Sequence, residues 1–159
     1  MRPFMALVIT LLLTNISFAQ LHNEESELFL NIFGRPKKEI VTQFVKIDGG
    51  RENQFKMIYD EYETKRKNLG EKRYVILSKY VKDYKQLSEA ETNEIIEDII
   101  ALTASQEKLI SQYYRKLKKS MGTFVAAQFY QIEWYLQSEM KANILENIPI
   151  INDLDRSQK

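Results

Sequence analysis

The fold of this protein is decided by one uninterrupted stretch, residues 87–119, which reads LSEAETNEIIEDIIALTASQEKLISQYYRKLKK. Ser88 stands where an N-cap belongs, and Glu91 three residues later completes a capping box. No Gly or Pro interrupts residues 88–119. The stretch therefore predicts one helix of roughly 45 Å, which other helices must cover along its length. Its apolar residues recur at helical spacing: Ile95, Ile99, Leu102, Leu109 and Tyr113.

A second long stretch, residues 51–86, also spaces its apolar side chains as a helix does. Leu87 and Ser88 make a short turn between the two stretches, so the helices are predicted to run antiparallel as a hairpin. Residues equally distant from this turn then face each other. Each exposed ion pair between them stabilises the fold by about 0.2–1 kcal/mol. Two blocks of charge match in this register: Lys79 and Lys82 with Glu91, Glu94 and Asp98, and Asp60, Glu61 and Glu63 with Arg115, Lys116 and Lys118.

Shorter helices are predicted on both sides of the hairpin, over residues 39–46 and 124–147. Asp48 is expected to cap the helix that starts at Arg51. The predicted fold class is therefore all-α, a long antiparallel helical hairpin with flanking helices, extended rather than globular. The last helix carries one continuous apolar stripe: Phe129, Ile132, Leu136, Met140 and Ile144.

The first residues predict export. Arg2 precedes an apolar run over residues 4–13, and Ser17 and Ala19 place small side chains at the −3 and −1 positions of a cleavage site. The run is shorter than the about 20 residues that span a bilayer. We therefore predict a cleaved signal peptide over residues 1–19 and a soluble exported protein without stable membrane insertion. An uncleaved anchor is the alternative.

The mature chain is predicted to have three parts. Residues 20–38 form an N-terminal arm, which is either a short ordered helix ended by Gly34 and Pro36 or a segment that stays mobile until a partner binds. Residues 39–151 form the helical domain. Residues 152–159 form a polar tail.

Charge and cysteine content narrow the function. Of the 23 bases only Arg2 lies in the predicted signal peptide, so the mature chain has as many bases as acids, 22 of each. A net charge of zero provides no general attraction to nucleic acid, which is not expected as a partner. The chain has no cysteine, so no disulfide stabilises it in an oxidising compartment. Stability must come from helix packing or oligomerisation.

No residue set has the pattern of a catalytic or metal site. A hydrolase needs a nucleophile with a base and an orienting partner, and a metal site needs convergent His, Cys or carboxylate ligands. His22 is the single histidine. We therefore predict no enzyme activity, no metal and no cofactor. We interpret Glu91, Glu94 and Asp98, which fall on one helical face, as solvated or salt-bridged charges. Glu133 and Glu139 in the last helix are interpreted as surface charges.

Two groups of residues are candidates for contact with a partner. For Trp134 and Tyr135, packing beneath a neighbouring helix is the favoured interpretation, and an exposed aromatic site is the alternative. Near the middle of the hairpin five bases gather around one acid, Glu71. We hypothesise that they form a basic patch for an acidic segment, an unfolding client or an anionic envelope polymer, with a merely solvated surface as the alternative. These bases are Lys65, Arg66, Lys67, Lys72 and Arg73.

The chain resembles the Spy/CpxP-like family of small helical proteins of the bacterial periplasm, roughly from Glu39 to Ile151. The family's Leu-Thr-x-x-Gln helix starts are not kept at residues 47–51 and 121–125. The resemblance implies an ATP-independent chaperone or a stress-sensing adaptor, and cradle-shaped dimers. It is carried by Phe55-Lys56-Met57-Ile58-Tyr59-Asp60-Glu61-Tyr62, by Leu87-Ser88-Glu89-Ala90-Glu91, and by Phe129-Tyr130-Gln131-Ile132-Glu133 with Asn147-Ile148-Pro149.

We therefore predict a non-enzymatic protein of the cell envelope, located in the periplasm. It binds protein partners or unfolding clients, either as a chaperone-like protein or as a stress-sensing adaptor. The alternative is a structural or oligomeric interaction protein without client binding. A homodimer is expected, because long helices in a thin chain leave apolar surface that few covering helices hide.

Overall fold

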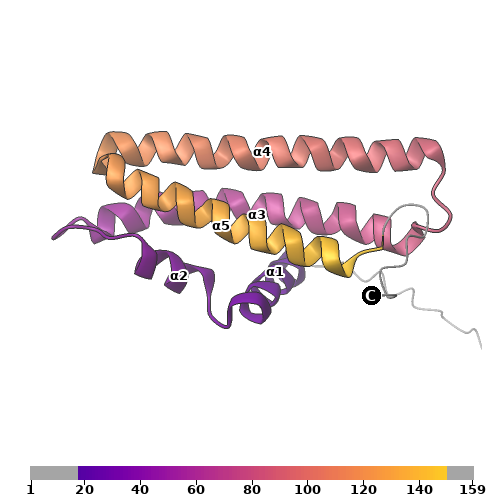
Figure 1. The fold of residues 1–159 in the computed structure, drawn as a ribbon, viewed down its shortest axis with the longest axis horizontal. Helices are drawn as coiled ribbons and strands as arrows, with labels where there is room; N and C mark the ends of the chain where they lie inside the picture. Colours follow the sequence, from indigo (N-terminus) through magenta and orange to yellow (C-terminus); the bar gives the residue numbers. More distant parts are fainter. Residues whose placement is uncertain (1–17, 150–159) are drawn as a thin grey trace, which may run out of the picture.

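The computed structural model describes residues 18–149, and over this range the protein consists of five helices without a strand (Figure 1). The predicted all-α fold class is confirmed. The predicted polar tail and signal peptide lie outside the described residues, except that Phe18 and Ala19 begin the first helix. The helices are α1 (Phe18–Phe33), α2 (Lys37–Phe44), α3 (Glu52–Asp83), α4 (Glu89–Met121) and α5 (Thr123–Asn147).

The long helices α3 and α4 lie side by side in opposite directions, and α5 returns along them (Figure 1). α5 starts beside the end of α4, where the rings of Tyr114 and Tyr130 have centroids 5.9 Å apart. It ends beside the end of α3, where the Tyr80 hydroxyl donates a hydrogen bond to the Pro149 carbonyl at 2.8 Å. α5 therefore crosses from α4 to α3 along its length. α1 packs on α3 and α5, and α2 packs on α5.

α4 begins with the capping box that the sequence predicts. The Glu91 backbone N–H donates to Ser88 Oγ at 3.3 Å, and the Ser88 backbone N–H donates to the Glu91 carboxylate at 2.9 Å. These bonds satisfy two N–H groups that have no partner inside a helix. They also lower the pKa of Glu91, since the Ser88 backbone and hydroxyl stabilise its charged form.

The predicted cap at Asp48 is wrong. α3 starts at Glu52, its N-cap is Arg51, and no side chain bonds to the first turn there. Gly50 has φ = +86°, in the left-handed region that glycine adopts without strain. This turn separates Asp48 from the first N–H groups of α3, so its carboxylate does not cap the helix.

The core is thickest around the aromatic side chains of α3. Tyr62 is fully buried and packs edge-on against Tyr113 of α4 and Phe129 of α5, with ring centroids 5.3 and 5.0 Å apart. The stripe predicted for α5 lies inside, with Phe129, Ile132, Leu136 and Met140 buried and Ile144 partly buried. Toward the turn between α3 and α4 the core thins. Among the described residues, the buried apolar side chains outside the main cluster are Tyr80, Ile95 and Leu102.

Two ion pairs join α3 to α4 in the register predicted from the charge blocks. Lys79 pairs with Glu94 at 3.2 Å, and Lys116 pairs with Glu61. The Lys116 ammonium is the largest cause of the low pKa of Glu61, which is about 2. All four side chains are about half exposed, so water screens both pairs and they contribute to register more than to stability.

Residues of the predicted N-terminal arm form helices in the structure. α1 ends at Phe33, and Gly34 follows with φ = +69°. α2 then begins at Lys37 rather than at residue 39, directly after Pro36, whose fixed φ suits a helix start. α2 therefore includes Lys37 and Lys38, the last two residues of the predicted arm. Between residues 18 and 149, none of the helices has the length and apolar character needed to cross a membrane.

Candidate functional site

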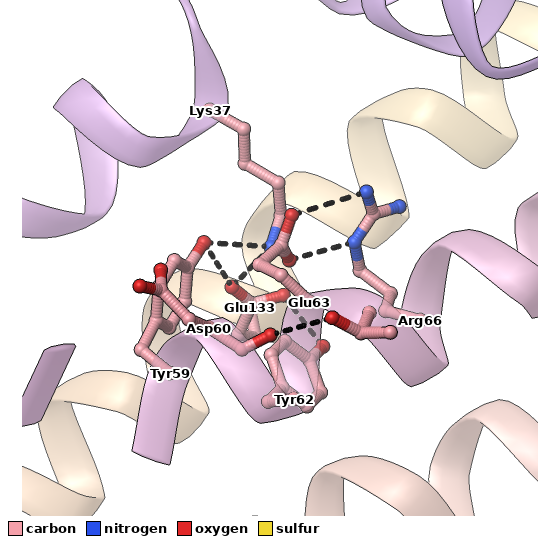
Figure 2. A network of polar contacts seen from close by, with 8 residues as sticks. Lys37, Tyr59, Asp60, Tyr62, Glu63, Arg66 and Glu133 are labelled. Carbon is pink, nitrogen blue, oxygen red and sulfur yellow. Dashed lines mark hydrogen bonds and ion pairs between the residues drawn. The ribbon is translucent and has the colours of Figure 1, made fainter. Parts of the chain in front are cut away.

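A buried ionic network joins α2, α3 and α5 (Figure 2). Its most buried member is Glu133 of α5, which is 0% exposed. Lys37 of α2 is 7% exposed, although it is the first residue of its helix. The remaining members come from one face of α3, at helical spacing: Tyr59, Tyr62, Glu63 and Arg66.

The ammonium group of Lys37 bridges two carboxylates. Its Nζ donates to Glu63 Oε1 and to Glu133 Oε1, both at 2.5 Å, and to the Tyr59 hydroxyl at 3.1 Å. The same Nζ lies 5.2 Å from the ring centroids of Tyr59 and Tyr62. All three donors of the ammonium group are therefore used, and two aromatic rings lie beside its positive charge.

Each carboxylate also has a second partner. The Tyr62 hydroxyl donates to Glu133 Oε2 at 2.7 Å, which leaves both oxygens of Glu133 bonded. Arg66 donates to Glu63 from Nε at 2.7 Å and from Nη2 at 3.2 Å, a bidentate contact. Two acids and two bases therefore balance, and these contacts meet the usual requirement for burying charge.

The environment shifts the ionisation of three members. Burial raises the pKa of Glu63, but Lys37 and Arg66 outweigh burial and hold that pKa at about 2. Burial, reinforced by the charge of Glu133, raises the pKa of Tyr59 and of Tyr62 well above the ordinary value. Both tyrosines therefore stay neutral and can donate. We interpret the network as a structural element that holds α2 and α5 on α3.

The sequence did not predict this network, and Glu133 was interpreted as a surface charge. That interpretation is wrong. Glu133 follows Phe129 by four residues and precedes Leu136 by three, so it lies within the apolar stripe of α5. A carboxylate inside such a stripe was the available signal, because it needs a buried cationic partner. The sequence contained no comparable signal for Lys37 as that partner.

The titration of Glu63 predicts loss of stability in acid. Because its folded pKa of about 2 lies below the ordinary 4.5, the unfolded state binds more protons in between. The contribution of the Glu63 carboxylate to the free energy of unfolding is complete above pH about 4.5. This contribution is lost as the pH falls toward about 2. Glu63→Gln should lower the free energy of unfolding at neutral pH and flatten its pH dependence in this window. Urea denaturation followed by circular dichroism measures both, and parallel profiles for the two proteins would contradict the assignment.

The five bases of the hypothesised basic patch do not share one surface. Arg66 is buried in the network, and Lys65 pairs with Glu61 at 3.1 Å while its Nζ lies 5.4 Å from the Tyr113 ring centroid. Lys72 is exposed, whereas Lys67 and Arg73 are partly buried. Arg66 thus faces the interior and Lys65 faces α4, which leaves no continuous patch of all five charges.

An open groove lies where α5 diverges from the first half of α4, with α3 as its third wall. Its volume is about 220 Å³. Arg73, Glu107 and Lys141 contribute charges to a lining that is otherwise mainly apolar. We call this space the α4–α5 groove. Its main apolar side chains are Ile76 and Leu77 of α3, Ile99 and Leu102 of α4, and Trp134 and Leu145 of α5.

Large apolar side chains at the α4–α5 groove remain open to solvent. Trp134 is 59% exposed, so the favoured interpretation that it packs beneath a helix is wrong. Tyr135 is half exposed, and its ring packs edge-on against Phe33 of α1 with centroids 6.4 Å apart. On α4, Ile96 and Ile100 are exposed one helical turn from Ile99 and Thr103 of the lining. The physical reason is the divergence of α5, which leaves no helix to cover this side.

Other site types find no support among residues 18–149. No group of three His, Cys, Asp or Glu side chains there could hold a metal ion. Glu91, Glu94 and Asp98 are exposed, as their interpretation as solvated or salt-bridged charges predicted. Glu91 belongs to the capping box and Glu94 pairs with Lys79.

Comparisons of this chain with protein-family models, with curated proteins and with solved structures found no match. The functional interpretation therefore rests on the site itself. The acids and bases of the ionic network bond to one another, whereas the α4–α5 groove is open and mainly apolar. Of the two, the groove has the geometry of a binding site.

Proposed function

We propose that this protein is a non-enzymatic binding protein of the cell envelope that takes apolar segments of other proteins into the α4–α5 groove. The observation that carries the proposal is the open apolar groove with Trp134 at its edge, 59% exposed. An exposed aromatic side chain beside aliphatic neighbours is the composition that protein interfaces concentrate at their centres.

The shape of the groove favours a helical segment as its ligand. α5 diverges from α4 toward the turn between α3 and α4, so a further helix can lie in the space between α4 and α5. An amphipathic helix placed there would bury its apolar face against Ile99, Leu102 and Trp134. This is the helix-in-groove mode of recognition, in which anchors repeat every three or four residues.

The proposed cellular role rests on features of the sequence. The N-terminal pattern supports export, and the resemblance to the Spy/CpxP-like family supports a periplasmic chaperone-like protein or stress-sensing adaptor that forms homodimers. A structural or oligomeric protein is the second candidate, favoured by Ile96 and Ile100, whose exposed side chains a second copy could cover. Lys72, an exposed base of the predicted set, can add attraction to acidic partners.

The single tryptophan of the chain makes the proposal directly testable. A peptide that forms an amphipathic apolar helix should shift the emission of Trp134 to shorter wavelength as it fills the groove. Trp134→Ala should weaken binding by roughly 2 kcal/mol or more, as measured by calorimetry, because a central tryptophan acts as a hot spot. Phe124→Ala is the matched control, since Phe124 is an 88% exposed aromatic residue on α5 that lies outside the groove lining.

The same variants separate the candidate roles. A chaperone suppresses the aggregation of an unrelated unfolding protein at stoichiometric amounts, and Trp134→Ala should impair this activity while Phe124→Ala keeps it. An adaptor instead binds one defined partner and leaves the aggregation unchanged. Equal affinity of the parent and Trp134→Ala for apolar helices would contradict the groove as the binding site.

A further inference from the structure

Charged side chains give the α4–α5 groove a polarity along its length. Within the described part of the chain, the charged residues of its lining are Arg73 on α3, Glu107 on α4 and Lys141 on α5. Two bases and one acid leave the lining with a net positive charge. The remaining lining is mainly apolar and lowers the local dielectric, so these charges act on a ligand more strongly than they would at an open surface.

The two bases lie at nearly the same level on two walls of the groove. α3 and α5 run in the same direction (Figure 1). Hydrogen bonds from the Tyr62 and Tyr80 hydroxyls toward α5 and its end join positions that are 71 and 69 apart in the chain. Position 73 of α3 is therefore level with positions 142–144, less than one helical turn beyond Lys141. Arg73 and Lys141 thus form a pair of positive charges at one level of the groove.

The acid lies about one helical turn nearer to Trp134 than this pair does. α4 and α5 run in opposite directions, and the Tyr114 and Tyr130 rings meet with centroids 5.9 Å apart. Glu107 precedes Tyr114 by seven residues, so it is level with position 137, which follows Tyr130 by seven. Lys141 comes four residues after this level, about 6 Å along the axis. A ligand that starts at the indole therefore passes the negative charge first and then the two positive charges.

We propose that the ligand of the α4–α5 groove is an acidic amphipathic helix that places a carboxylate between Arg73 and Lys141. This inference rests on the proposed function and adds the chemical class of the ligand. Lys141 follows Trp134 by seven residues, or two helical turns, which puts both on one side of α5. A ligand helix that lies along α5 therefore needs its Glu or Asp seven residues from the apolar side chain that packs on Trp134.

The same three charges select against other amphipathic helices. A carboxylate between a guanidinium and an ammonium group accepts charge-assisted hydrogen bonds from both. A lysine at this position of the ligand meets two like charges instead. An acid placed only three residues from the apolar anchor lies at the level of Glu107 and is repelled. The specificity of the groove thus comes from repulsion as well as from attraction.

Four helical peptides that differ at one or two positions test the ligand class with the full chain. Each has a single Phe as the anchor for Trp134. The first has Glu seven residues after the Phe, the second has the same Glu three residues after it, and the others have Lys or Gln at the seventh position. Calorimetry and the emission of Trp134 measure binding. The first peptide should bind about tenfold more tightly than the lysine peptide at low salt. It should also bind more tightly than the second, although both have the same composition.

Charge reversal in the protein provides the reciprocal test. Lys141→Glu should remove the preference for the first peptide over the lysine peptide. Lys108→Glu is the matched control, because Lys108 is an exposed base outside the groove lining and its reversal changes the net charge equally. This control should keep the order of affinities that the parent shows. Raising the salt concentration should reduce the preference of the parent, since exposed charges are screened beyond about 8 Å at physiological ionic strength.

The outcomes separate this inference from the proposed function. Equal affinities for the glutamate and lysine peptides, with binding of the glutamine peptide that depends on Trp134, would overturn the acidic ligand and keep the proposed function. Equal affinities for the two glutamate peptides would overturn the placement of the carboxylate between Arg73 and Lys141. A preference that Lys108→Glu abolishes as fully as Lys141→Glu does would also overturn it, in favour of attraction by net charge. Failure of all four peptides to bind would contradict the proposed function itself.

Discussion

Glu133→Ala is expected to lower the free energy of unfolding by about 3–5 kcal/mol, the usual cost of breaking a buried ion pair on one side. The Lys37 ammonium, 7% exposed, would lose one of its two carboxylate partners, and the Tyr62 hydroxyl would lose its acceptor. The substitution also leaves a cavity between α3 and α5. Urea denaturation followed by circular dichroism measures the loss.

Glu139→Ala provides the matched control for this prediction. Glu139 lies on the same helix but is exposed, so the same substitution should change stability by no more than about 0.5 kcal/mol. The double variant Lys37→Met/Glu133→Leu should be more stable than Glu133→Ala, because it removes both charges and fills the space with apolar atoms. Equal losses for Glu133→Ala and Glu139→Ala would show that Glu133 is not buried.

Phe129→Ala should be similarly destabilising, by about 3–5 kcal/mol. Phe129 is 0% exposed, and its ring packs against Tyr62 with centroids 5.0 Å apart and against Tyr59 with centroids 6.5 Å apart. Removing it deletes the contact between α5 and the aromatic residues of α3, and the neighbouring rings are too rigid to fill the space. Thermal and urea unfolding measure the effect.

Phe124→Ala tests whether the loss of stability in Phe129→Ala comes from the buried position of Phe129 rather than from the removal of a phenylalanine. Phe124 lies five residues earlier on α5 and is 88% exposed, so its truncation should fall within about 0.5 kcal/mol of the parent. A loss at Phe124 comparable to that at Phe129 would mean that the buried face of α5 is assigned incorrectly.

Local signals in the sequence were sufficient to predict where the long helices lie and which side chains they bury. The capping box at Ser88 and Glu91 predicted the start of α4, because a cap depends only on residues within one turn. The apolar stripe of α5 predicted its buried face, because helical spacing alone decides which side chains share a side. Asp48 failed as a cap because the conformation of the turn at Gly50 shifted the start of α3.

The sequence by itself therefore determined an all-α protein, the extent of its long helices and most of its core. The tertiary structure alone decided the direction in which α5 crosses from α4 to α3, and both candidate sites depend on it. That crossing brings Glu133 to Lys37, which lies 96 positions away in the chain. It also uncovers Trp134 beside Ile99 and Leu102. Contacts between helices distant in sequence depend on their packing geometry, which no local pattern of residues encodes.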